Sequence, residues 1–295
     1  LEDDWSQNAD PHDIDTLWDL LKDLPDTNVE GNTKIREIQL GIGESGGFYQ
    51  PGTNDISIGS AMLTHREAFE DVVRHEVGHA VHEMRTPLID GWLAERFGWQ
   101  TFGRTDSEID RWVELMGGWG DLTSRQRRDV RDALRTALGH GSSWQPGPTP
   151  TLTPGHPWYD ADFGPRLAFE RTGANWYSNH NVWYRAGGKA FFLNYWYRTF
   201  VAVSEETLDL VSRMPDPYAA MSHYEFFAEL YALHYDVEDD RTAIPDDVAQ
   251  WLDANIGAPE PGAPMVSLTR PAPPREWETV TRPGMPGDAA SDQTA

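Results

Sequence analysis

Apolar side chains recur at helical spacing along two stretches in the first third of the chain. From Asp13 to Leu24 they fall on one stripe, and from His65 to Met84 they form a longer face that includes Phe69, Val73 and Val77. Each pattern predicts an amphipathic helix with one face packed against a core.

Short strands are expected between these two helices. Apolar and polar residues alternate from Ile35 to Leu40, and the segments Phe48–Tyr49 and Ile56–Ile58 flank the turn-rich segment Gln50–Asp55. The pair of segments Phe48–Tyr49 and Ile56–Ile58 predicts a hairpin. Together the patterns predict an α+β fold, mostly helical, with a small mixed sheet.

Six further helices are expected between residues 85 and 256. Helices are predicted at Leu88–Trp99, Glu108–Leu115, Ser124–Leu138, Lys189–Val203, Glu205–Met214 and Pro217–Tyr235. Asp216 is a suitable N-cap for the last of these helices. Lys189–Val203 belongs to a dense aromatic cluster, which we interpret as core packing in preference to a ligand-binding surface.

Two stretches rich in Pro are not expected to form regular elements. Residues 139–165 predict a long loop or a lid, and residues 257–295 predict a C-terminal tail. We therefore expect a single domain at 1–256, followed by the tail.

The charge balance is strongly acidic. Acidic residues outnumber basic ones by 48 to 24, which gives a formal net charge of −24. Because nucleic-acid binders present a basic surface, this charge argues against nucleic acid as a partner, and also against anionic membranes. It fits either a solvated acidic surface or the attraction of cationic substrates.

The sequence contains no Cys, so disulfides, Cys nucleophiles and Cys metal ligands are excluded. No apolar run is long enough to span a membrane. The first residues, Leu1–Asp4, are acidic and unlike a signal peptide. Because the chain lacks an initiator Met, we expect it to be either a processed protein or an engineered segment, and either is compatible with a removed export signal.

The strongest chemical signal is the run from His75 to His79. The two histidines are four residues apart on a predicted helix, so both imidazoles project from the same face, as two ligands of a tetrahedral zinc ion must. Glu76 follows the first His and is placed to act as general base toward a zinc-activated water. The alternative is a solvated helix face with two ordinary histidines.

Zinc needs a third protein ligand. The candidates are His82, His180, His223, Glu225, Glu229 and His234. Glu225 and Glu229 share one face of a largely apolar helix, and two buried carboxylates are costly unless a positive group lies near them. Glu225 is therefore the preferred ligand, with Glu229 accepting the other ring N–H of a liganding His. The alternative is that both carboxylates are exposed.

Tyr218 precedes Glu225 by two helical turns. Its hydroxyl could stabilise the oxyanion of a tetrahedral intermediate, although a Tyr at a helix start can equally serve in packing. His223 and Tyr224 are weaker alternatives for the same role.

These residues resemble a known family. The run His75-Glu76-Val77-Gly78-His79-Ala80, followed by Tyr218 and then Glu225-Phe226-Phe227-Ala228-Glu229, is similar to the catalytic domain of the anthrax-toxin lethal-factor-like metallopeptidases. The resemblance implies His75, His79 and Glu225 as ligands of one zinc ion per chain, Glu76 as general base and Tyr218 as transition-state stabiliser.

The resemblance also implies a zincin-like fold, with the metal site between two core helices. A peptide or protein substrate would lie extended beside an edge strand, here near Asp55–Gly59. The segment between the two blocks is longer than in the family, so residues from about 85 to 215 would form a helical, aromatic-rich insert.

Three functions remain open at this point. The first is a zinc-dependent endopeptidase, in the manner of an exported or injected bacterial effector or toxin domain. The second is a catalytically silent binding module with the same fold. The third is a zinc hydrolase of a non-peptide amide. The intact Glu76 favours an enzyme over the silent module.

Overall fold

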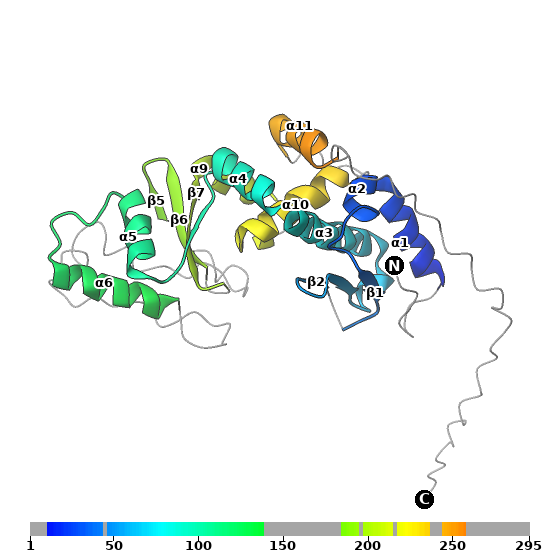
Figure 1. Ribbon diagram of the computed structural model, residues 1–295, viewed down its shortest axis with the longest axis horizontal. Coiled ribbons are helices and arrows are strands. Elements are labelled where there is room, and N and C mark those ends of the chain that lie inside the picture. Colours follow the sequence, from blue (N-terminus) through cyan, green and yellow to red (C-terminus); the bar gives the residue numbers. More distant parts are fainter. Residues whose placement is uncertain are drawn as a thin grey trace, which may run out of the picture.

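The computed structural model describes residues 11–43, 46–138, 184–194, 197–214, 217–236 and 244–257. The protein is α+β and mostly helical, with two small sheets. Helices α3 (Arg66–Met84) and α10 (His223–Tyr235) lie side by side at the centre of an elongated molecule (Figure 1).

The predicted helices in the first half of the chain are confirmed to within a few residues. Besides α3 and α10, the helices among the described residues are α1 (Pro11–Asp23), α2 (Asp26–Val29), α4 (Thr86–Phe97), α5 (Asp106–Leu115), α6 (Ser124–Ala137), α9 (Glu205–Val211) and α11 (Asp246–Asn255), with 3-10 turns η1 (Met62–Thr64) and η3 (Pro217–Ala220). Thr105 and Thr123 cap α5 and α6 through reciprocal side-chain bonds with the third residue of each helix. Helix α11 was not predicted from the sequence.

The first sheet is mixed, as expected, but its edge differs from the expected one. Its strand order is β1 (Glu37–Leu40), β3 (Asp55–Ile58), β2 (Gly47–Gln50), with β3 parallel to β1 and antiparallel to β2. The predicted hairpin is therefore confirmed. The segment near Asp55–Gly59 is not an edge, because β3 pairs on both sides, and the strand at the edge beside α3 is β2.

The second sheet corrects the helix predicted at Lys189–Val203. Its order is β4 (Gln100–Phe102), β7 (Thr199–Ser204), β6 (Lys189–Asn194), β5 (Tyr184–Ala186), with all neighbours antiparallel. Both faces of its central strands are buried. A strand that is buried on both faces has a continuous apolar sequence, and periodicity cannot distinguish such a sequence from that of a buried helix.

The two faces of that sheet belong to different cores. Phe192 and Val201 face the core that contains α3 and α10, whereas Phe191 and Phe200 face a second core with α5 and α6. The expectation that the aromatic residues pack in a core is confirmed for the three phenylalanines. The insert expected at about 85–215 is therefore not simply helical, since it holds this four-stranded sheet.

The helix predicted from Pro217 to Tyr235 is divided in two. Residues Pro217–Ala220 form the 3-10 turn η3, and α10 begins only at His223, with Ser222 as its N-cap. Asp216, the predicted cap, lies outside the described residues, as do the predicted loop at 139–165 and the tail beyond residue 257.

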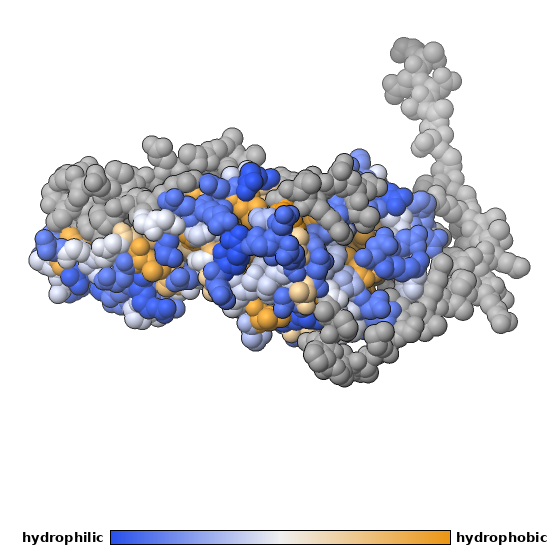
Figure 2. All heavy atoms as spheres, turned by 90° about the horizontal axis from the view of Figure 1, so that it is seen from above, coloured by the Kyte–Doolittle hydropathy of each residue, from blue (hydrophilic) through white to orange (hydrophobic). Residues whose placement is uncertain are grey.

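Hydrophilic residues cover most of the described surface in the view of Figure 2, with small apolar patches between them. Within the described residues, no helix combines the length and apolarity needed to cross a bilayer.

A glycine allows the two central helices to approach closely. A Cβ atom added at Gly78 of α3 would lie 3.0 Å from the Cα of Ala228 and 3.3 Å from its carbonyl oxygen, both in α10. Because these are backbone atoms, a side chain at position 78 would have to push the helices apart.

We expect Gly78→Ala to lower the free energy of unfolding by about 1–3 kcal/mol, the usual effect of overpacking a core. Urea denaturation of protein with fixed metal content measures this change. Gly91→Ala is the matched control, because Gly91 is also helical but a Cβ there meets nothing within 4 Å. The control should gain about 0.5–1 kcal/mol from helix propensity. Equal effects of the two substitutions would contradict the close approach.

Candidate metal centre

Helix α3 places the two histidines of the motif on its partly exposed side. Val73, Val77 and Val81 are fully buried, which turns the opposite side of the helix toward α10 and solvent. His75 and His79 project from this side with their rings at 83° to each other and 4.7 Å between centroids. Spacing by one helical turn therefore produces the arrangement that the sequence predicted.

Helix α10 brings Glu225 to the same point. The Ser222 side chain accepts a hydrogen bond from the Glu225 backbone N–H, which starts the helix. In the capping box of α5, the Glu at the equivalent position, Glu108, turns its carboxylate back to the N-cap. The Glu225 carboxylate faces the histidines instead, although it too occupies the third position of its helix.

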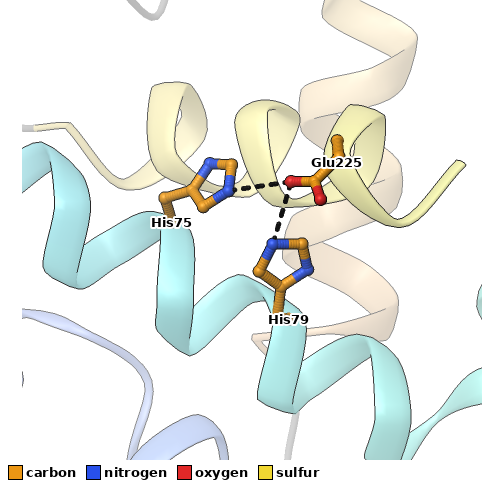
Figure 3. Close-up of side chains that lie close together, drawn as sticks. All are labelled: His75, His79 and Glu225. Atoms are coloured by element: carbon orange, nitrogen blue, oxygen red, sulfur yellow. Dashed lines mark hydrogen bonds and ion pairs between the residues drawn. The ribbon is translucent and has the colours of Figure 1, made fainter. Parts of the chain in front are cut away.

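Three ligand atoms converge between the two helices (Figure 3). Glu225 Oε2 lies 3.2 Å from His75 Nε2 and 3.0 Å from His79 Nε2. A tetrahedral zinc ion with bonds of about 2.0–2.1 Å holds its ligand atoms about 3.3 Å apart. Two imidazole nitrogens and one carboxylate oxygen thus form a donor set that fits zinc in both chemistry and spacing.

Glu229 supports this arrangement from one turn farther along α10. Its Oε1 lies 2.9 Å from His75 Nδ1, on the opposite side of the ring from Glu225. A carboxylate at this nitrogen orients the imidazole and leaves Nε2 to face the ligand position. The carboxylate pair is therefore not solvent-exposed, and Glu225 and Glu229 contact the same histidine through its two different nitrogens.

Glu76, a residue of α3, is buried against the edge strand β2. A Cβ atom added at Gly47 of β2 would collide with Cγ1 of Val72 and would lie 2.7 Å from both Cγ and Oε1 of Glu76, so only a glycine fits there. Glu76 is 5% exposed, and burial raises the pKa of its carboxyl, partly offset by the charges of His75 and His79. A carboxylate with a raised pKa accepts a proton more readily, which suits a general base.

His75 and Glu225 shift each other's protonation. Burial lowers the pKa of His75, but hydrogen bonds to Glu225 and Glu229 outweigh this effect and raise its pKa well above the usual value. Burial opposes ionisation of Glu225, yet its contacts with His75 and His79 lower its pKa to about 2. Glu225 is therefore ionised at neutral pH, as a metal-binding carboxylate must be.

Among the described side chains, Tyr197 is a tyrosine that lies near Glu225, and sequence analysis did not predict it. Tyr218 lies in η3 rather than on α10, and its side chain is outside the described part of the structure. The Tyr197 hydroxyl instead lies 3.4 Å from Glu225 Oε1. Burial and the Glu225 charge raise the pKa of Tyr197, so its hydroxyl keeps its proton and can donate.

Tyr197 comes from the turn between β6 and β7, which reaches back to α10. Its backbone N–H donates to Asn194 Oδ1, and the Asn194 amide donates to the carbonyl of Met221, just before the helix. Sequence reasoning missed Tyr197 because it placed this segment inside a helix. The signal available in the sequence was the polar residues Asn194 and Arg198 that interrupt an apolar run. In the structure, Arg198 takes a positive φ of 53° in the turn.

The other candidate ligands do not join this group. His82 and His223 approach Asp90, and His234 pairs with Asp253 at 2.8 Å. His180 lies outside the described residues.

Comparisons of this chain with protein-family models, with curated proteins and with solved structures found no match.

The pKa shifts predict how this cluster contributes to stability in chelator-treated protein. Because the pKa of His75 is raised, its contribution is present below its usual pKa of 6.5 and is lost as the pH rises through the higher folded-state value. Because the pKa of Glu225 is lowered from 4.5 to about 2, its contribution is lost as the pH falls through that range. We therefore expect the cluster to stabilise most between the two usual values.

Urea denaturation of wild type and His75→Asn at several pH values measures this contribution as a difference in unfolding free energy. The difference should be largest between pH 4.5 and pH 6.5 and decrease as the medium becomes alkaline. Parallel pH profiles for the two proteins would contradict the described contacts of His75.

Proposed function

We propose that this protein is a zinc-dependent endopeptidase with a zincin-like arrangement, in which His75, His79 and Glu225 hold the metal. The observation that carries the proposal is the convergence of these three ligand atoms from two helices, at distances of 3.0 and 3.2 Å about one carboxylate oxygen. Catalytic zinc sites have three protein ligands, such as two His and one Glu, and an open fourth position, whereas structural zinc sites have four protein ligands.

Partial exposure supports a catalytic site. The His75 and His79 side chains are 12% and 14% exposed, so a substrate can approach the ligand position from solvent. A zinc ion held there would polarise the scissile carbonyl and lower the pKa of water. Glu76 would accept a proton as the water oxygen attacks the carbonyl carbon, then deliver it to the amine nitrogen as the C–N bond breaks.

Among the described side chains, Tyr197 has a hydroxyl placed to stabilise the oxyanion that forms during this attack. Its hydroxyl keeps its proton, and it lies near the Glu225 carboxylate on the side of the insert. A hydrogen bond donated to developing negative charge stabilises the transition state more than the ground state.

The edge strand β2 offers a binding surface for an extended peptide. It ends its sheet beside Glu76, and its Phe48 side chain is 59% exposed. A peptide added along this edge would form backbone hydrogen bonds with β2 and pass the general base. The resemblance to lethal-factor-like peptidases supports the same mode, with the edge moved from β3 to β2.

The charges near the site favour a cationic substrate. A hollow lies along the part of α3 that precedes His75. It is lined by four acidic residues and two arginines, which are Glu67, Glu70, Asp71, Asp236, Arg66 and Arg74. Together with the net charge of −24, this surface attracts basic peptides more than acidic ones. Delivery as a bacterial effector or toxin domain fits this activity and is part of the proposal.

We expect Glu76→Gln to retain bound zinc and to lower kcat by at least about 10²-fold, because the amide keeps the shape of the carboxyl but cannot accept the proton. Digestion of a peptide library, together with metal analysis of the same samples, measures both effects. Glu206→Gln is the matched control, since this carboxylate is 67% exposed and pairs with Arg96. Cleavage by Glu76→Gln at the control rate would rule out the mechanism.

We expect Tyr197→Phe to lower kcat by about 10²-fold with zinc content and KM nearly unchanged, because the lost hydrogen bond belongs to the transition state. Tyr218→Phe serves as the comparison and should retain activity. If Tyr218→Phe loses activity and Tyr197→Phe does not, the role belongs to Tyr218. Loss of zinc from Tyr197→Phe would assign Tyr197 to the positioning of Glu225 instead.

A further inference from the structure

A second group of metal-ligating side chains lies where three helices meet. It consists of His82 near the end of α3, Asp90 in α4 and His223 at the start of α10. None of the three takes part in the site formed by His75, His79 and Glu225. Each comes from a different helix, so the group exists only in the folded protein.

The distances within this group approach those of a metal site. Asp90 Oδ1 lies 2.8 Å from His82 Nε2 and 3.6 Å from His223 Nε2, and all three ligand atoms lie within 4.8 Å of one another. Since a tetrahedral zinc ion holds ligand atoms about 3.3 Å apart, small rotations of Asp90 and His223 would suffice.

The burial of the three side chains differs in a way that suits an exchangeable ion. The His82 side chain is fully buried, and the rings of Tyr224 and Phe227 pack against it at centroid distances of 4.7 and 5.1 Å. The Asp90 side chain is 41% exposed, so it forms the rim of the group. Packing therefore fixes the His82 ring, while an ion could enter from solvent past Asp90.

A simple pair of His82 with Asp90 does not explain why His223 also approaches Asp90. His234 and Asp253 form such a pair at the same distance of 2.8 Å, and among the described residues this pair belongs to no group of three metal-ligating side chains. His223 instead brings a second imidazole to the carboxylate that His82 already contacts, and the two rings lie 5.6 Å apart at 74°. Two imidazoles directed at one carboxylate are arranged as metal ligands are.

We propose that His82, Asp90 and His223 form a second binding site for a divalent transition metal, of which zinc is the best fit. Two nitrogens and one oxygen suit zinc better than calcium or magnesium, which prefer oxygen ligands alone. This site binds more weakly than the first one, because its ligand atoms are less evenly spaced and one ligand is partly exposed.

A metal bound at this second site would act on the first. His82 follows His79 by three residues on α3, and His223 precedes Glu225 by two residues on α10. An ion between His82 and His223 therefore ties together the two helices that supply the ligands of the first site, and fastens α4 to both. The second site thus links zinc concentration to the stability of the first.

Equilibrium dialysis against zinc, with metal analysis of the protein, tests the proposal. We expect wild type to reach about two zinc ions per chain and Asp90→Asn to reach about one, because the amide is a poor zinc ligand. Asp253→Asn is the matched control and should bind as wild type. His223→Gln provides a second variant of the site, and a melting curve of each variant checks that it is folded.

The first site is tested separately, so that failure of one proposal is not read as failure of the other. His79→Ala should remove the tighter zinc and keep the ion that depends on Asp90. Should the first site bind no metal, wild type would bind one ion and Asp90→Asn none, and the second-site proposal would stand. If Asp90→Asn and His223→Gln bind as much zinc as Asp253→Asn, the second-site proposal is overturned.

Discussion

The close packing of α3 against α10 is the constraint on which the rest of this structure depends. Gly78 lies against the backbone of Ala228 at a point where even a Cβ atom would stand 3.0 Å from a backbone carbon. His75 and His79 flank Gly78 on α3, and Glu225 and Glu229 flank Ala228 on α10. The approach of the two backbones is therefore what brings His75 Nε2 to 3.2 Å from a carboxylate that is 150 residues away in the chain.

This contact would be unfavourable without compensation. Three carboxyl groups and two histidines are drawn into a partly buried region, where an unpaired charge costs several kcal/mol. The histidines and the carboxylates of Glu225 and Glu229 compensate one another through direct contacts, and Glu76 lies against Gly47 of β2, with its charge partly offset by His75 and His79. Such a concentration of ionisable groups in one place is more typical of a functional site than of a structural core.

The sequence allowed the central part of this arrangement to be predicted because it depends on local spacing. The periodicity of α3 set the face of His75 and His79, and the cost of burying Glu225 and Glu229 on an apolar helix pointed to their contact with a positive group. The hairpin of β2 and β3 followed from its turn residues. What could not be predicted depends on long-range pairing: β1 adds to β3 rather than leaving it at an edge, and β6 and β7 have two buried faces, which hides the period of two. Tyr197 was missed for the same reason, since its position follows from the turn between these strands.

The proposed function requires α3 and α10 to hold a zinc ion between His75, His79 and Glu225. Metal analysis of wild type and Glu225→Ala, both purified without chelators and without added zinc, tests it most directly. We predict about one zinc ion per chain in wild type and a sharp loss in the variant, because two histidines alone form an incomplete site. Equal zinc content in the two proteins, or none in wild type, would contradict this claim.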